Sequence, residues 1–239
     1  MEEKLINDTI KLRNENSIYT IEFEYSSYEL INSLIKTRII VGGSTDESYK
    51  TLRFKAKSVK TLNEYLHDKK VENGRRRVLV SDAAKMIRSL TVQLNYLIEV
   101  ESHTILGYNP AYIIVINDLN FAYLNSELVA DFGMTYGGDD MAMISCLFSS
   151  NNIFASPEIL KVKEIPWFTH YKTAYFSLGL LIIYVLLGDD EFYKDFLKNN
   201  DSSIILNILN NHPVKNTKIY WLLSRCLVEE PKDRSIILI

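Results

Sequence analysis

Two groups of side chains, the cysteines and a run of arginines, are of types that could bind a ligand or react in many different folds. The two cysteines, Cys146 and Cys226, lie far apart and match no metal-ligand spacing or disulfide framework. We therefore expect them to be buried, reduced thiols. A run of three arginines, Arg75-Arg76-Arg77, follows a turn at Glu72-Asn73-Gly74 and could bind a phosphate or an acidic partner. A solvated charged turn is the simpler interpretation.

Three short motifs in the second half of the chain are more informative because of their order. Ser156-Pro157-Glu158 comes first, Ser177-Leu178-Gly179 then opens an apolar run, and the segment 226–234 reads C-L-V-E-E-P-K-D-R. Residues 80–239 thereby resemble the large lobe of a eukaryotic-type protein kinase. In that family an A-P-E motif closes the activation segment, a D-x-W-S-x-G helix forms the hydrophobic axis, and a C-L-x-x-D-P-x-x-R segment supplies an arginine. The resemblance implies an ion pair between Glu158 and Arg234. An unrelated α+β or helical domain is the alternative.

The segment that resembles the kinase catalytic loop lacks the groups that phosphoryl transfer needs. The family motif is H-R-D-x-K-x-x-N, whose aspartate and asparagine handle the substrate proton and magnesium. The corresponding segment, His103–Tyr112, contains no carboxylate and no lysine. Catalysis of this reaction is almost wholly electrostatic, so neutral side chains cannot replace them. His103 aligns with a structural histidine of the family and is expected to be a core or hydrogen-bonded residue.

The tripeptide Asp131-Phe132-Gly133 is the main ambiguity in this comparison. The magnesium-binding D-F-G motif is expected directly after Leu124, and the tripeptide lies further along. It is either a displaced magnesium site or a coincidence within a degenerate activation segment. We favour coincidence, because a magnesium aspartate without a phosphate lysine or a catalytic base has little to act on. The aspartate that braces the family's catalytic loop is replaced by Ala174, and Phe176 stands in place of the tryptophan.

The resemblance also implies a small lobe with a glycine-rich loop and a lysine on its third strand. The cluster Gly42-Gly43-Ser44 lacks the required glycine spacing and reads as a plain turn. Lys50, Lys55 and Lys57 are candidates for the strand lysine, although solvated strand faces explain them more simply. About sixty residues leave little room for five strands and a helix, so we expect a truncated lobe.

Local patterns predict the elements that surround these motifs. In the first part, β-branched and aromatic runs predict strands over 17–25, 38–41 and 51–56, and Ser26 with Glu29 has the form of a capping box before a helix through residues 30–35. The resemblance to a kinase also implies a helix at 62–66, as the first helix of the large lobe. Ser81-Asp82 should cap a long helix over 83–99, and a hairpin should join strands 113–116 and 121–124. The apolar run from Leu178 to Leu187 is about half the roughly 20 residues that a membrane span needs, so it predicts a buried helix.

Length and composition narrow the class of protein. The 239 residues suit one large domain or two small lobes, and 47% hydrophobic with 24% charged residues indicates a globular chain. The net charge of −3 supplies no positive field for nucleic acid or an anionic membrane. The acidic N-terminus from Met1 to Lys4 has no apolar signal segment, which favours an intracellular location.

These patterns predict an α+β chain, and the resemblance implies a protein-kinase-like two-lobe fold. Residues 1–62 would form a reduced, mostly β N-lobe, and residues 63–239 a mainly helical C-lobe. A weaker resemblance to divergent kinase-like proteins of large DNA viruses rests on the segments 154–159 and 175–179 and on the end of the chain soon after Arg234. If the chain is viral, its location would be the host cell or the virion.

The predicted function is that of a pseudokinase, a catalytically inactive binding or scaffold protein. We predict a protein partner, no nucleic acid, no membrane span and no cofactor, and we assign no catalytic, cofactor-binding or metal-binding residue. One alternative is a divergent active Ser/Thr kinase that uses Mg-ATP through Asp131 and an unrecognised lysine and base. Another is a structural protein unrelated to kinases. No oligomerisation signature is present in the sequence.

Overall fold

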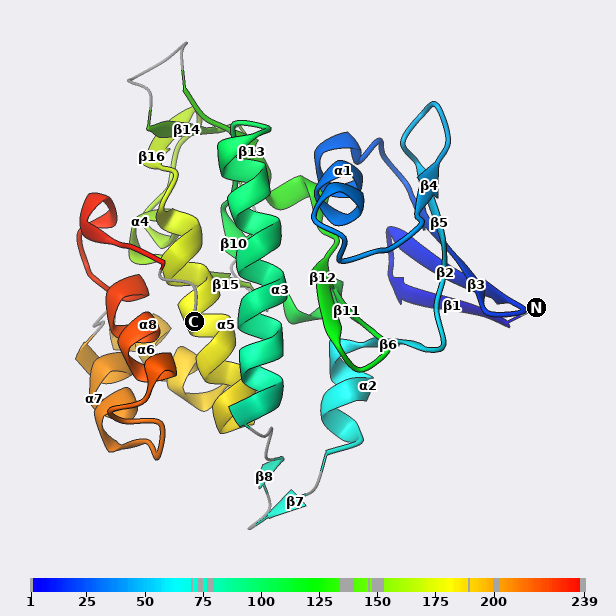
Figure 1. Cartoon of the computed structure of the whole chain (residues 1–239). Coiled ribbons are helices and arrows are strands. Elements are labelled where there is room, and N and C mark those ends of the chain that lie inside the picture. The colour runs from blue at the N-terminus through cyan, green and yellow to red at the C-terminus, as the bar shows by residue number, and fades with distance from the viewer. Residues whose placement is uncertain are drawn as a thin grey trace.

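The computed structural model describes residues 2–69, 71–72, 75–76, 80–133, 140–145, 147, 153–188, 190–199 and 203–236. The chain has a mixed α+β architecture, with a β-rich N-terminal region and most of its helices later (Figure 1). The α+β part of the predicted fold class is therefore confirmed. The boundary expected after residue 62 stays a prediction.

An antiparallel sheet forms the N-terminal region. Its order is β1-β2-β3-β5-β4, with β1 at Glu2–Asn7, β2 at Ile10–Glu15, β3 at Ile18–Phe23, β5 at Thr51–Lys55 and β4 at Ser44–Thr45. The strands predicted at 17–25 and 51–56 are confirmed, but the expectation that five strands would not fit is wrong. The turns between β1, β2 and β3 contain only two residues each, and the second has positive φ at Asn16 and Ser17, as tight hairpin turns require.

Helix α1, at Tyr28–Lys36, follows the third strand. The helix was predicted, but its capping box is wrong. Ser27 is the N-cap, so Glu29 stands one position too early to reach back to the cap, and the Ser27 hydroxyl instead donates to the carbonyl of Tyr25. The strand expected over 38–41 is also wrong. There the chain turns after α1, with Arg38 at φ +61°, and the buried side chains explain the apolar pattern.

A second, three-stranded sheet joins the two parts of the chain. Its order is β12-β11-β6, with β12 at Asn120–Tyr123, β11 at Ile113–Ile116 and β6 at Val59–Thr61. The predicted hairpin is confirmed, and its turn has positive φ at Asn117 and Asp118. The expected helix α2, at Leu62–His67, follows β6 directly and has a complete capping box between Thr61 and Glu64.

The remaining strands form short pairs that connect the helices. They are β7 (Val71–Glu72) with β8 (Arg75–Arg76), β9 (His103–Ile105) with β13 (Val129–Asp131), β10 (Gly107–Tyr108) with β15 (Phe154–Ala155), and β14 (Met141–Ile144) with β16 (Trp167–His170). Single 3-10 turns are η1 (Pro110–Tyr112), η2 (Ser126–Leu128) and η3 (Pro231–Asp233).

The later helices are α3 (Val80–Glu99), α4 (Pro157–Leu160), α5 (Thr173–Leu187), α6 (Glu191–Asn199), α7 (Ser203–Asn211) and α8 (Lys218–Cys226). Helix α3 was predicted but begins before its expected caps, so Ser81 and Asp82 lie inside its first turn and that cap assignment is wrong. The buried Asp82 carboxylate instead accepts hydrogen bonds from Lys69 at 2.7 Å and Lys85 at 3.1 Å. A carboxylate at this end of a helix is favoured by the helix dipole.

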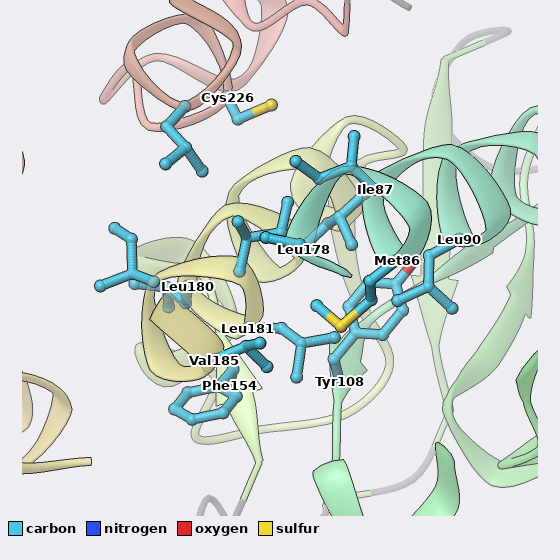
Figure 2. Packing of buried hydrophobic residues seen from close by; sticks show 14 of the residues in the cluster. Met86, Ile87, Leu90, Tyr108, Phe154, Leu178, Leu180, Leu181, Val185 and Cys226 are labelled. Carbon is cyan, nitrogen blue, oxygen red and sulfur yellow. The ribbon is translucent and has the colours of Figure 1, made fainter. Parts of the chain in front are cut away.

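Helix α5 is the centre of the largest hydrophobic cluster, as its apolar sequence predicted. It lies beside α3, with α6, α7 and α8 on its other side (Figure 1). Leu181 points toward Met86 of α3 and Tyr108 of β10 (Figure 2). The helix ends at Gly188, whose φ of +78° is a left-handed conformation that glycine adopts without strain. Across the described residues, no helix combines the length and apolarity required to cross a membrane.

Candidate functional site

A buried ion pair joins the two motifs that the sequence analysis linked. Arg234 donates to Glu158 through Nη1 at 2.5 Å and Nη2 at 3.0 Å, and the predicted pair is therefore confirmed. The Arg234 side chain has no exposed surface, whereas Glu158 is 21% exposed. Arg234 also donates to the carbonyls of Val228 and Glu229, and its guanidinium lies 4.8 Å from the ring centre of Phe176. Four hydrogen bonds and one aromatic ring thus surround this buried cation.

Two short helical turns hold the pair in place. Ser156 precedes α4, and Pro157 at its first position starts the turn that carries Glu158. The Ser156 and Thr173 hydroxyls are hydrogen-bonded, which ties α4 to the start of α5. On the other side, η3 turns the chain after α8 so that Arg234 points back toward α4.

Burial opposes the ionisation of Glu158, but hydrogen bonds and attraction from Arg234 outweigh burial and hold its pKa below the ordinary value. A carboxyl with a lowered folded-state pKa stabilises the fold above its unfolded pKa of about 4.3, and this stabilisation is lost as the pH falls through the lower folded value. We expect the difference in unfolding free energy between the wild type and Glu158→Gln to be largest near neutral pH and to shrink on acidification. Denaturant unfolding from about pH 7 to pH 3 measures this difference. A difference that grows toward acid would contradict the assigned charge state.

The segment His103–Tyr112 consists largely of short strands and a 3-10 turn. It forms β9, β10 and η1, and the Asn109 side chain accepts a hydrogen bond from the Ala111 amide to start the 3-10 turn. The His103 ring is half-buried and its Nδ1 lies 2.6 Å from the Glu101 carbonyl oxygen, so the expected hydrogen-bonded role is confirmed. Tyr108 is fully buried, and its ring lies 4.9 Å from that of Tyr123.

Asp131 ends strand β13 and is exposed, directly opposite His103 in the antiparallel register. Phe132 stacks on Tyr171 at 4.8 Å, and Gly133 has φ +95°. Within the described part of the chain, no group of three acidic, histidine or cysteine side chains is close enough to hold a metal ion. Asp131 therefore belongs to no such three-residue group among these residues.

The N-terminal sheet places no lysine on its third strand, since β3 reads I-Y-T-I-E-F and all of it is described. Lys50, Lys55 and Lys57 are exposed and lie on or beside β5, as expected for solvated residues. The turn between β1 and β2 is Asp8-Thr9, without glycine. The Gly42-Gly43 pair forms the predicted turn, with Gly42 at φ +67°.

An open pocket of about 670 Å³ lies between α2, η1, β15, α5 and α6. Its wall includes Phe154 and Tyr193, whose rings meet edge to face at 4.9 Å. The Tyr193 hydroxyl donates to the Ile153 carbonyl at 2.7 Å and accepts from the Ala155 amide at 3.0 Å, which fixes this wall. Asp190 and Lys194 pair at 2.8 Å on the rim. Sequence reasoning missed the pocket, because it forms where five separate elements meet.

One other surface, the turn with three arginines, was singled out from the sequence. The side chains of Arg75-Arg76-Arg77 lie outside the described residues, as does Cys146. The loop from Glu158 to Tyr171 carries two exposed apolar side chains, Ile165 at 45% and Trp167 at 44%. Cys226 is a buried free thiol, as predicted, and burial raises its pKa to about 12.

No protein-family model matches the chain, and a search among curated proteins finds no significant match.

Proposed function

We propose that the chain is a protein-kinase-like binding module that does not transfer phosphate. The observation that carries the proposal is the buried pair between Glu158 and Arg234. It joins residues 76 positions apart through the Ser-Pro-Glu segment and the C-terminal arginine segment, as the kinase resemblance requires. A chance match of two short motifs gives no reason for such a contact.

The described chain lacks groups that phosphoryl transfer needs in this family. The reaction requires a phosphate-binding cation, a base and magnesium ligands at fixed places. Strand β3 carries no lysine, His103–Tyr112 carries no carboxylate, and the buried Ala174 stands where the family has its bracing aspartate. Asp131 alone cannot supply these charges.

The partner site in this proposal is the pocket between α2 and α6. A pocket of about 670 Å³ falls in the range of roughly 300–1,000 Å³ that ligand sites occupy. Its aromatic wall offers apolar contact, and Asn63 and the Asp190–Lys194 pair offer polar contact at its edge. We assign it to a short segment of a protein partner, for which these apolar and polar contacts would serve.

The proposal is tested in two arms. In the first, the purified protein is mixed with magnesium and labelled ATP in the presence of general protein acceptors and no label transfer is expected. In the second, the partner recovered by cross-linking is titrated against the wild type and Leu197→Arg, since Leu197 lines the pocket and is 39% exposed. We expect the variant to bind at least about tenfold more weakly while it unfolds like the wild type.

Leu206→Arg is the matched control, because Leu206 is a similarly exposed helical leucine on α7 outside the pocket lining. Label transfer that Asp131→Ala abolishes would replace the proposal with the active-kinase alternative. Equal binding by the wild type and both variants would place the partner surface elsewhere.

A further inference from the structure

The N-terminal sheet and the β11–β12 hairpin share one continuous hydrophobic cluster. The sheet contributes side chains such as Ile10, Ile21 and Phe23, and α1 contributes Ile31 and Leu34. The hairpin side chains of this cluster are all at most 4% exposed, namely Ile114, Ile116, Ala122 and Leu124. This surface between the two regions is packed like a protein interior.

Gln93 of α3 connects three elements inside this packed region. Its Oε1 accepts from the Tyr123 amide at 3.0 Å, and its Nε2 donates to the Tyr123 carbonyl at 2.9 Å. The same Nε2 donates to the Ser33 hydroxyl of α1 at 3.2 Å, and that hydroxyl donates to the Leu30 carbonyl at 2.7 Å. Gln93 and Ser33 are fully buried. The amide thus bonds α3 to both β12 and α1.

Further hydrogen bonds cross the same boundary. The Asn120 side chain donates to the Ile39 carbonyl at 3.0 Å, and the Asn117 side chain accepts from the amides of Lys57 and Ser58. At the solvent edge, Lys4 of β1 pairs with Glu64 of α2. The N-terminal region is therefore attached through the turn after α1, the segment after β5, and strand β1.

One hollow that the described residues form at this boundary is too small for a nucleotide. The hollow beside Thr9, Ile10, Phe23, Tyr112 and Leu124 measures about 10 Å³. A single water needs about 10–15 Å³ of such space, so the hollow holds one water at most. Mg-ATP, which a kinase-like fold implies, does not fit the residues present there.

We infer that the boundary between the N-terminal sheet and the helical region is a permanently packed core, with Gln93 as the positioning residue that fixes α1 and β12 on α3. The sheet does not open to admit a nucleotide, and α1 keeps one position. The nucleotide part of this inference rests on the proposed function, whereas the packing part does not.

Hydrogen exchange of the full chain, read by mass spectrometry, tests the packing. In the wild type, amides of α1 and β12 are expected to exchange as slowly as those of α3 and α5, because they open only on global unfolding. In Gln93→Leu, which leaves the buried Tyr123 amide and carbonyl without their partner, amides of α1 and β12 should exchange about 10- to 100-fold faster, with a smaller change in α5. Ser89→Ala is the control, since that hydroxyl on the same helix bonds only within α3, to the Lys85 carbonyl.

Each outcome decides one part of the inference. Fast exchange of α1 and β12 in the wild type would overturn the packed core. An equal increase in all elements, or the same pattern in Ser89→Ala, would overturn the role of Gln93. Millimolar Mg-ADP or Mg-ATP should leave the melting temperature unchanged, because a ligand that binds only the folded state would raise it. A rise without phosphoryl transfer would overturn the closed boundary and leave the proposed function standing.

Discussion

Replacing Arg234 with alanine is expected to lower the free energy of unfolding by about 3–5 kcal/mol, the usual effect of removing one partner of a buried ion pair. The change removes the bidentate contact to Glu158, the bonds to two carbonyl groups and the contact with the Phe176 ring. It also leaves a largely buried carboxylate without its cation. Equilibrium denaturation in urea measures the loss.

Arg225→Ala is the matched control for this prediction. Arg225 lies nine positions earlier on α8 and is exposed, so its removal should change stability by no more than about 0.5 kcal/mol. Arg234→Lys keeps the charge but loses the two-pronged geometry, and should fall between the wild type and the alanine variant.

A double-mutant cycle separates the ion pair from the other contacts of Arg234. Glu158→Ala and Arg234→Ala remove the same interaction. The free energy of unfolding of the double variant should therefore not fall below that of the less stable single variant. Mild and additive effects would show that the pair does not hold the two segments together, and the kinase-like proposal would lose its main support.

Contacts could be predicted from the sequence where a recognisable motif specified both contacting segments. The Glu158–Arg234 pair could be named in advance because the resemblance to a kinase implied it, and the hairpin at 113–124 because its turn residues tolerate positive φ. The capping box at Ser26 failed through a shift of one residue in the helix start. Such boundaries depend on tertiary contacts that a local pattern does not contain.

Some strands of the N-terminal region, the pocket between α2 and α6 and the packed boundary of the sheet could not be predicted from the sequence. Strands β1 and β2 contain charged residues such as Lys4, Lys11 and Arg13, and only pairing with a neighbour gives them a buried face. A polar residue on a helix is ordinarily predicted to face solvent. Gln93 instead forms hydrogen bonds with α1 and β12, which its local sequence does not indicate. The pocket and the packed boundary both arise from elements far apart in the chain.

The second large effect is expected in the central helix. Leu181 is fully buried on α5 and points toward Met86 of α3 and Tyr108 of β10 (Figure 2). Leu181→Ala should lower the free energy of unfolding by about 2–5 kcal/mol, since it removes buried apolar surface and leaves a cavity that its neighbours fill only in part.

Leu206→Ala on α7 is the control for Leu181→Ala. It also replaces a helical leucine with alanine, so the change in helix propensity is the same in both variants. Leu206 is 36% exposed, so the two variants differ in the burial of the side chain that is removed. Thermal and urea unfolding of both variants measures the contrast. If the two losses are equal, α5 is not the packed centre of the chain. If only Leu181→Ala is strongly destabilised, the short apolar run is a core helix covered on all sides, as its length and its end at Gly188 require.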